Sequence, residues 1–233
     1  MAGIKLKSED DLLLMRPACE VAGKVLDEVS AYIKPGMTTR EVDNFAAERI
    51  KSYGGKSAFL GYRKYPCYTC LSVNSEVVHG LATERELRLG DIVSVDVGVL
   101  YKGFIGDTAR TVAVGGCSLA AQQLLEVTEQ SLYLGIAQAK ADNRVVDISI
   151  AVQQYVEKHG FSVVREFVGH GVGRTMHEEP QVPNFDEGRK NSHGDPLRIK
   201  SRQIMTYASR CVPTHPGSAR AIWLRDRSID PLG

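Results

Sequence analysis

The stretch from residue 91 to residue 110 constrains the fold more than any other, because it contains two β-rich runs joined by a tight turn. Isoleucine, valine and leucine dominate the first run, and Lys102–Gly103 offers a two-residue hairpin loop. In that hairpin Gly98 faces Asp107, and Asp96 lies two positions along the same face. The sequence therefore predicts two aspartates as diagonal neighbours on one face of an otherwise apolar hairpin.

The two aspartates raise the question of what balances their charge. Two like charges on a buried face are costly unless a cation lies between them, and Gly98 leaves space opposite Asp107 for a third body. A divalent metal ion, or a pair of ions, would meet that need. The alternative is a pair of solvated aspartates on an exposed face, and the hairpin alone does not decide between the two.

Composition excludes several classes of protein. The chain has 233 residues, enough for one large domain or two small ones, and its formal net charge of +1 gives no reason to expect a nucleic-acid partner. No apolar run approaches the ~20 residues of a membrane span. The charged N-terminus lacks a signal-peptide core, and five scattered cysteines fit a reducing cytoplasm. We expect a cytoplasmic protein without a membrane partner.

Helix and strand signals alternate along the chain. Capping boxes begin at Ser8 and Thr38. The helical patterns run over Leu12–Ile33, from Thr38 to Gly54, and over Leu119–Lys140 and Val145–Lys158. Besides the hairpin, strand-like runs occupy Cys67–Val73, Glu76–His79 and Phe161–Val168. Arg40–Asp43 and Arg144–Asp147 begin similar helices, which indicates two related α/β halves, although chance similarity of two amphipathic helices is a competing explanation.

Histidines supply the remaining chemistry. His170 stands between glycines after an apolar run, and one imidazole with two carboxylates suits Mn, Fe, Co, Ni or Zn. His177 begins a His-Glu-Glu-Pro sequence that is not a zincin helix, because Pro180 would break it. His79 is either a substrate contact or a strand histidine. Tyrosines and a cysteine in the region of residues 62–70 form either an apolar pocket or an ordinary core cluster.

Taken together, these motifs resemble type I methionine aminopeptidase, of the pita-bread metallopeptidase family. The matching segments are Gly61–Pro66, Ser72–Gly80, Asp91–Val97, Gly103–Thr108, Val163–Arg174 and His177–Asn184. The resemblance covers roughly residues 5–200. It implies an α/β (α+β) pita-bread fold, with two pseudo-symmetric halves around a central antiparallel-rich sheet, in a domain spanning residues 1–200.

The resemblance also implies an activity and a set of site residues. The activity is hydrolytic, metal-dependent removal of the N-terminal methionine from nascent proteins, with two divalent ions per chain (Co, Mn, Fe, Zn or Ni). The implied roles are metal ligands for Asp96, Asp107 and His170, catalytic and substrate contacts for His79 and His177, and a methionine pocket formed by Tyr62, Tyr65 and Cys70. Met176 stands where the family usually has an aromatic residue.

The segment 201–233 departs from the family as a divergent or frameshifted tail. The family has two further glutamate ligands in this region, whereas no glutamate follows Glu187 here. We therefore expect impaired activity and incomplete C-terminal strands. One alternative is a catalytically inactive pita-bread protein that binds a peptide or a partner. A prolidase-like peptidase is the other, and the short N-terminal extension argues against it.

The expected partners follow from the same resemblance. The substrate is the N-terminal methionine of a nascent peptide, with a small second residue, and the ribosome is a further candidate partner. No nucleic acid is expected to bind directly. The chain is expected to act as a monomer.

Overall fold

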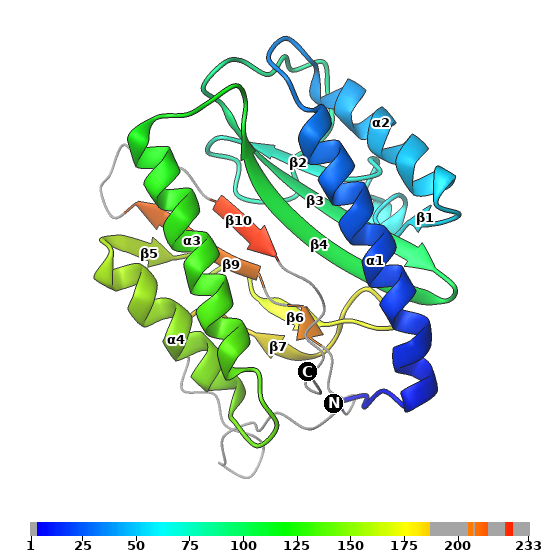
Figure 1. The fold of residues 1–233 in the computed structure, drawn as a ribbon, viewed down its shortest axis with the longest axis vertical. Coiled ribbons are helices and arrows are strands. Elements are labelled where there is room, and N and C mark those ends of the chain that lie inside the picture. The colour runs from blue at the N-terminus through cyan, green and yellow to red at the C-terminus, as the bar shows by residue number, and fades with distance from the viewer. Residues whose placement is uncertain (1–3, 187–204, 207, 214–221, 226–233) are drawn as a thin grey trace.

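The computed structural model describes residues 4–186, 205–206, 208–213 and 222–225, and places them in two α/β halves (Figure 1). The first half contains α1 (Glu9–Tyr32), α2 (Thr39–Ser52), β1 (Lys56–Ser57), the short 3₁₀ helix η1 (Tyr62–Lys64), β2 (Cys70–Val73), β3 (Ile92–Tyr101) and β4 (Phe104–Ala113). The second half contains α3 (Leu119–Gln138), α4 (Val145–Lys158), β5 (Phe161–Val163), β6 (Gly169–Gly171), β7 (Glu178–Val182), β8 (Met205–Thr206), β9 (Ala208–Pro213) and β10 (Ile222–Arg225). This confirms the expected mixed architecture.

Strand β3 is the centre of the first sheet. It pairs antiparallel with β4 along its whole length, while β1 and β2 pair with its other edge. A second sheet has the order β10-β9-β5, and a third has the order β7-β6-β8. Strand β10 lies beside β4, which brings the second sheet next to the first (Figure 1). Every described pairing is antiparallel, as the resemblance implied.

Local sequence signals set the helix ends. The Ser8 side chain caps the N-terminus of α1 and Asp11 returns a hydrogen bond to the backbone of Ser8, and Thr38 with Glu41 does the same for α2. Both predicted capping boxes are thus confirmed. Helix α4 has the predicted bounds, and α3 ends at Gln138, two residues before the predicted end.

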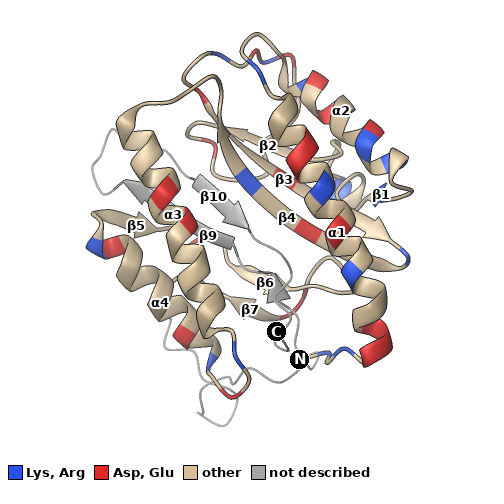
Figure 2. Ribbon diagram, in the orientation of Figure 1, with Lys and Arg blue, Asp and Glu red and all other residues tan. Residues whose placement is uncertain are grey.

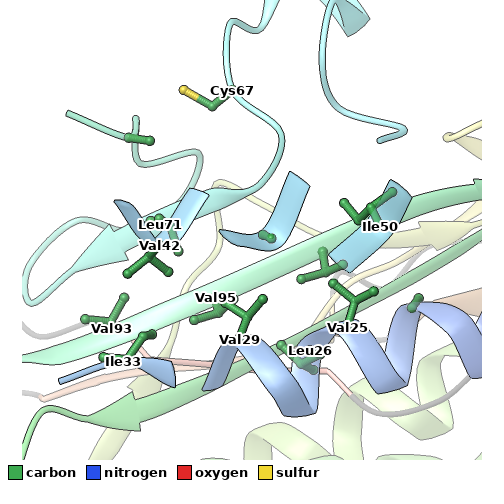
Figure 3. Close-up of a cluster of buried hydrophobic side chains, with 14 of the residues drawn as sticks. Val25, Leu26, Val29, Ile33, Val42, Ile50, Cys67, Leu71, Val93 and Val95 are labelled. Carbon is green, nitrogen blue, oxygen red and sulfur yellow. The ribbon is translucent and has the colours of Figure 1, made fainter. Parts of the chain in front are cut away.

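Each half has its own apolar core. In the first, valines of α1 pack against α2 and the sheet, as Val25, Val29 and Val95 show in Figure 3. In the second, α3 and α4 bury Leu124 and Ile148 against strands β5 and β7. Charged residues of both signs occur along α1 and α2 (Figure 2). Among the described residues no helix is long and apolar enough to cross a membrane.

Two strand expectations differ from the structure. Glu76–His79 is not a strand, because Asn74 and His79 have left-handed backbones with φ of 56° and 54°, which extended pairing does not allow. The strand predicted over Phe161–Val168 ends at Val163, and a new strand, β6, begins at Gly169.

The tail contains short strands. Its described strands are β8, β9 and β10, with two, six and four residues, and β9 pairs with both β5 and β10. The predicted domain boundary near residue 200 lies outside the described residues.

A close approach between α1 and β4 makes one glycine a test of the fold. A Cβ atom on Gly106 would lie 2.3 Å from the backbone oxygen of Ala18 in α1. A Cβ atom on Gly23, which is part of α1, would meet nothing within 4 Å. We expect Gly106→Ala to lower the free energy of unfolding by about 1–3 kcal/mol. Gly23→Ala, the control, should raise it by about 0.5–1 kcal/mol, because alanine favours a helix interior. Urea denaturation measures both, and equal effects would contradict this packing.

Candidate active site

A cavity of about 500 Å³ lies between the first sheet, the segment 59–79 and strand β6. Its walls combine aromatic, imidazole and basic side chains with one carboxylate. The lining residues are Phe59, Tyr62, Arg63, Lys64, Tyr65, Pro66, Cys70, Val78, His79, Asp96, Phe167, Val168, Gly169, His170, Met176 and His177. Seven of the eight predicted site residues are in this set. The eighth, Asp107, contacts His170, so the structure brings all of them to one place.

The hairpin places the two aspartates as predicted. Gly98 pairs with Asp107 and Asp96 pairs with Ala109, so both carboxylates are on one face of the β3–β4 ribbon. Asp96 is half-buried in the cavity wall, and the side chain of Asp107 is 0% exposed. A fully buried carboxylate of this kind needs a compensating charge or hydrogen bonds.

The space above Gly98 is not open, contrary to the expectation from the sequence. A Cβ atom on Gly98 would lie 2.4 Å from the ring of Phe59. The glycine is therefore needed for Phe59 to pack on the hairpin, and this ring forms part of the cavity wall. No space for a third body remains directly over Gly98.

His170 reaches the aspartates from β6 rather than from a loop. Its Nε2 lies 3.8 Å from Oδ2 of Asp107, and its Nδ1 is 2.9 Å from the backbone oxygen of Gly171. A carbonyl oxygen only accepts, so Nδ1 carries the proton, and in the neutral ring Nε2 presents a lone pair. Burial lowers the pKa of His170, which favours this neutral form.

A metal fits the chemistry of these donors. The imidazole lone pair of His170 faces the buried carboxylate of Asp107, as two ligands of one metal ion would. The backbone oxygen of Gly171, which bonds Nδ1, is the usual kind of partner that orients a metal-binding histidine. Asp96 adds a third ligand, and a second carboxylate, on the same face. Within the described part of the chain, however, no group of three or more His, Cys, Asp or Glu side chains is gathered closely enough to hold an ion. The residues fit as a partial ligand set.

His177 lies between the partial ligand set and the pocket. Its ring centroid is 4.1 Å from that of His170, and its Nδ1 is 2.8 Å from the hydroxyl of Tyr62. Burial, reinforced by neighbouring His170 and Arg63, lowers the pKa of His177 to about 4. His177 is therefore neutral at neutral pH and can donate one hydrogen bond without carrying charge.

Tyr65, Cys70 and His79 form another part of the wall. The Tyr65 hydroxyl donates to the backbone oxygen of Gly80 at 2.8 Å, which fixes the ring. Burial raises the pKa of the Cys70 thiol, so it remains protonated and acts as a small apolar surface. The ring centroids of His79 and Phe167 are 5.9 Å apart, and the two rings are nearly perpendicular, at 84°.

Asp43 is a positioning residue that the sequence patterns did not identify. Its buried carboxylate accepts hydrogen bonds from the backbone nitrogen and the hydroxyl of Thr69, both at 2.7 Å, and from the backbone nitrogen of Tyr68 at 3.2 Å. Helix α2 thereby holds the segment that leads into Cys70. Only the helix-start motif containing Asp43 was visible in the sequence.

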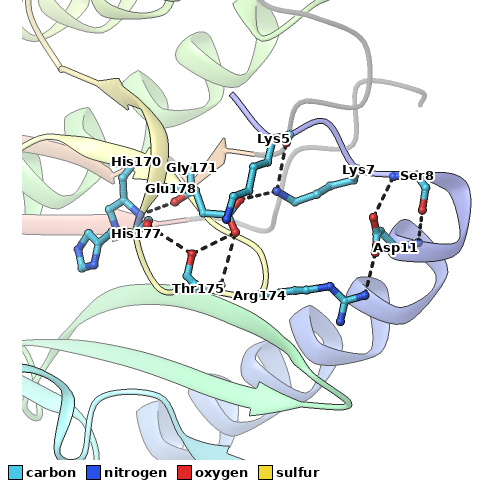
Figure 4. A network of polar contacts seen from close by, with 10 residues as sticks. All are labelled: Lys5, Lys7, Ser8, Asp11, His170, Gly171, Arg174, Thr175, His177 and Glu178. Atoms are coloured by element: carbon cyan, nitrogen blue, oxygen red, sulfur yellow. Dashed lines mark hydrogen bonds and ion pairs between the residues drawn. The ribbon is translucent and has the colours of Figure 1, made fainter. Parts of the chain in front are cut away.

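A second unpredicted feature ties the N-terminal segment to the site. Lys7 Nζ lies 2.6 Å from Oε2 of Glu178, and both side chains are buried, at 6% and 4% exposure (Figure 4). Glu178 also accepts a hydrogen bond from the Thr175 hydroxyl at 3.1 Å. Because Glu178 directly follows His177, this pair fixes the backbone beside the pocket. The partners are 171 residues apart in the sequence, and no local pattern links them.

Known proteins are similar to this chain in both sequence and fold. Residues 13–219 match metallopeptidase family M24. A methionine aminopeptidase of Clostridium perfringens is 48% identical over 182 residues, which cover 78% of this chain and 73% of that protein. Methionine aminopeptidase 1 of Bacillus subtilis is 43% identical over 209 residues, covering 89% and 84%. The crystal structure of methionine aminopeptidase from Thermotoga maritima superimposes with a TM-score of 0.90 at 33% identity, covering 99% of this chain and 97% of that one.

Proposed function

This chain belongs to metallopeptidase family M24 and, within it, to the methionine aminopeptidases, and from that premise we propose that it releases the N-terminal methionine of a peptide bound in the cavity. The observation that carries the proposal is that one cavity brings together an apolar wall, His177 and the face bearing Asp96. The relatives favour an enzyme over the inactive peptide-binding alternative.

The pocket wall suits an unbranched apolar side chain. Tyr62, Tyr65 and Cys70 offer aromatic and sulfur surface with no ionised group, and Met176 adds a flexible thioether. A methionine side chain can pack against such a surface without leaving a polar group unpaired. We propose that these residues select methionine, with His79 beside the bound peptide.

His177 is proposed to stabilise the charge that develops on the scissile carbonyl oxygen. If the Tyr62 hydroxyl donates to Nδ1, the proton of the neutral ring is on Nε2, which can donate to the substrate. Tyr62 then fixes both the orientation and the tautomer of His177. This role requires no charge on the imidazole.

Metal dependence follows from family membership, and the ligands are proposed as Asp96, Asp107 and His170. When bound, a divalent ion supplies a water that loses its proton near neutral pH. The three donors carry two negative charges, which balance one divalent cation. We therefore propose that the first ion binds firmly and a second one weakly, with Co, Mn, Fe, Zn or Ni as candidates.

The biological setting is part of the same proposal. We propose a cytoplasmic monomer that acts on nascent chains, with the ribosome as a candidate partner and residues 201–233 as a tail that diverges from the family. The free state of the four cysteines within the described residues supports a reducing environment.

The direct test compares release of different N-terminal residues. The 233-residue chain with Mn²⁺ should release methionine from Met-Ala-Ser at least about 10-fold faster than leucine or lysine from the matched peptides. His177→Ala should lower kcat/KM by about 10²–10³-fold. His159→Ala is the control, because His159 is exposed at the end of α4 and bonds only its own helix in the contacts described here. Equal cleavage after methionine, leucine and lysine would exclude the proposed selectivity.

A further inference from the structure

Two consecutive basic residues at the cavity mouth have an unusual backbone. Arg63 and Lys64 have φ of 48° and 67°, and Gly61 before them has φ of 80°. The turn is closed by a hydrogen bond of 2.8 Å from the backbone nitrogen of Gly61 to the backbone oxygen of Tyr65. Glycine adopts this region freely, whereas each non-glycine residue there costs of the order of 1 kcal/mol or more.

The surroundings hold this turn in place. Tyr65, which ends it, is anchored through its hydroxyl to the backbone oxygen of Gly80, and Tyr62, which begins η1, is bonded to His177. The turn therefore presents its two basic side chains from a fixed backbone. Both Arg63 and Lys64 line the cavity and are exposed.

Neither basic side chain is paired with an acid in the part of the chain that the structure describes. The guanidinium of Arg63 lies 5.5 Å from the Tyr62 ring centroid, a cation–π contact that leaves its positive charge uncompensated. No ion pair joins Arg63 or Lys64 to a described aspartate or glutamate. Asp96 is the one carboxylate among the described lining residues, and it is half-buried on β3.

The charges of Arg63 and Lys64 should orient a peptide that binds in the cavity. Arg63 and Lys64 are exposed and make this part of the cavity wall positive, so they repel the cationic N-terminus of a peptide and attract an acidic side chain. Once the N-terminal residue is inside, the following residues leave past the basic turn. An acidic side chain on those residues would meet two positive charges that are held in place.

We propose that Arg63 and Lys64 form a specificity site for an acidic side chain at the third or fourth position of the substrate peptide. The proposal rests on the proposed function, because it takes the N-terminal residue to occupy the cavity. Exposed ion pairs are worth little singly, so two cations should favour aspartate over asparagine by about 3- to 10-fold. Salt should weaken the preference, since both charges are exposed.

The test measures binding and does not depend on turnover. The probes are C-terminally amidated Met-Ala-Asp-Ser and Met-Ala-Asn-Ser peptides whose first peptide nitrogen is replaced by a methylene, with a second matched pair that places aspartate or asparagine at position four. Calorimetric titration of the full chain with Mn²⁺ present should show tighter binding of at least one aspartate peptide at low salt. Equal affinities in both pairs would overturn the proposal.

Charge variants assign the effect to the turn. In the double variant Arg63→Gln, Lys64→Gln the aspartate preference should disappear, and in Arg63→Glu, Lys64→Glu it should reverse toward a lysine peptide. Lys51→Gln, Lys158→Gln removes the same charge from exposed positions on α2 and α4 and should retain the preference. A preference that survives in the first double variant, or is lost in the control, would overturn the assignment to Arg63 and Lys64.

Failure of the proposed function gives a different result. Replacing methionine by leucine in the asparagine probe tests the apolar pocket alone. If methionine and leucine probes bind equally, the proposed selectivity for methionine fails, whatever the charge result. If methionine binds better while aspartate and asparagine peptides bind equally, only the basic specificity site is wrong.

Discussion

Replacement of Lys7 by methionine is expected to lower the free energy of unfolding by about 3–5 kcal/mol, because it leaves the carboxylate of Glu178 buried without its cation. The aliphatic part of the side chain is retained, so the loss is mainly electrostatic. Removing both charges, in Lys7→Met, Glu178→Gln, should recover most of the stability, since a buried pair contributes little beyond its apolar replacement. Urea denaturation of the two variants and the original chain measures these terms.

The surface offers a matched control for this pair. Arg110 and Asp27 also lie 2.6 Å apart, but their side chains are 45% and 66% exposed. Arg110→Met should therefore cost no more than about 1 kcal/mol. Similar losses in the buried and the exposed pair would show that burial does not govern the energy of the Lys7–Glu178 contact.

Acid provides a second measurement on the same pair. Burial pushes the pKa of Glu178 up, but the hydrogen bonds and charge of Lys7 and the Thr175 contacts outweigh it, so the native pKa lies below its usual value. A depressed carboxylate pKa contributes stability that is present at neutral pH and is lost as the pH falls through the native pKa. The difference in stability between the original chain and Lys7→Met should shrink in that acid range. A constant difference from pH 7 to pH 2 would contradict this account.

Short-range rules were enough to predict most of the first half. The capping boxes at Ser8 and Thr38 and the register of the β3–β4 hairpin depend on residues close together in sequence, and the structure has them as predicted. The diagonal placement of Asp96 and Asp107 follows from that register alone. The aspartate face of the site was therefore predictable from one stretch of about 20 residues.

Long-range packing could not be predicted in the same way. The ring of Phe59 covers Gly98 from a segment 39 residues earlier, and nothing local to the hairpin indicates which side chain arrives there. The same holds for Lys7 and Glu178, which come from opposite ends of the described domain. A glycine in a strand indicates a close neighbour, but its identity depends on the whole fold.

Backbone conformation explains the remaining errors. Glu76–His79 has apolar residues suited to a strand, yet the left-handed residues Asn74 and His79 end extended pairing around it. His170, which stands between two glycines, lies on a three-residue strand paired with both β7 and β8, and the sequence analysis did not predict that strand. Glycine patterns predict freedom of the backbone and do not tell whether a neighbouring strand will pair with it.

Removal of a proposed metal ligand should have opposite effects on ion binding and on the stability of the metal-free chain. Asp107 is a fully buried carboxylate beside the neutral His170, on the same face as Asp96. Without an ion, the buried charge is costly, so Asp107→Asn should raise the Tm of the metal-free chain. With an ion, the same substitution removes a direct ligand, and its cost should exceed the 10–100-fold loss typical of residues that only support ligands.

Thermal unfolding with and without metal separates these two effects. At an ion concentration of 100 times Kd, binding should stabilise the original chain by about 2.7 kcal/mol. In Asp107→Asn that stabilisation should fall close to zero, and His170→Ala should behave in the same way. The control is Glu126→Gln, an exposed carboxylate on α3 that contacts Gln122 of its own helix and should leave the metal effect unchanged.

Calorimetric titration with Mn²⁺ and Co²⁺ then gives the number of ions. The carboxylates of Asp96 and Asp107 balance the charge of one divalent cation, and no glutamate follows Glu187 in the sequence to balance another. A second divalent ion at the same site would add an uncompensated double positive charge, and like charges repel strongly at low dielectric. We expect one ion to bind firmly and any second ion far more weakly. Two firmly bound ions, or unchanged affinity in Asp107→Asn, would show that other side chains supply the ligands.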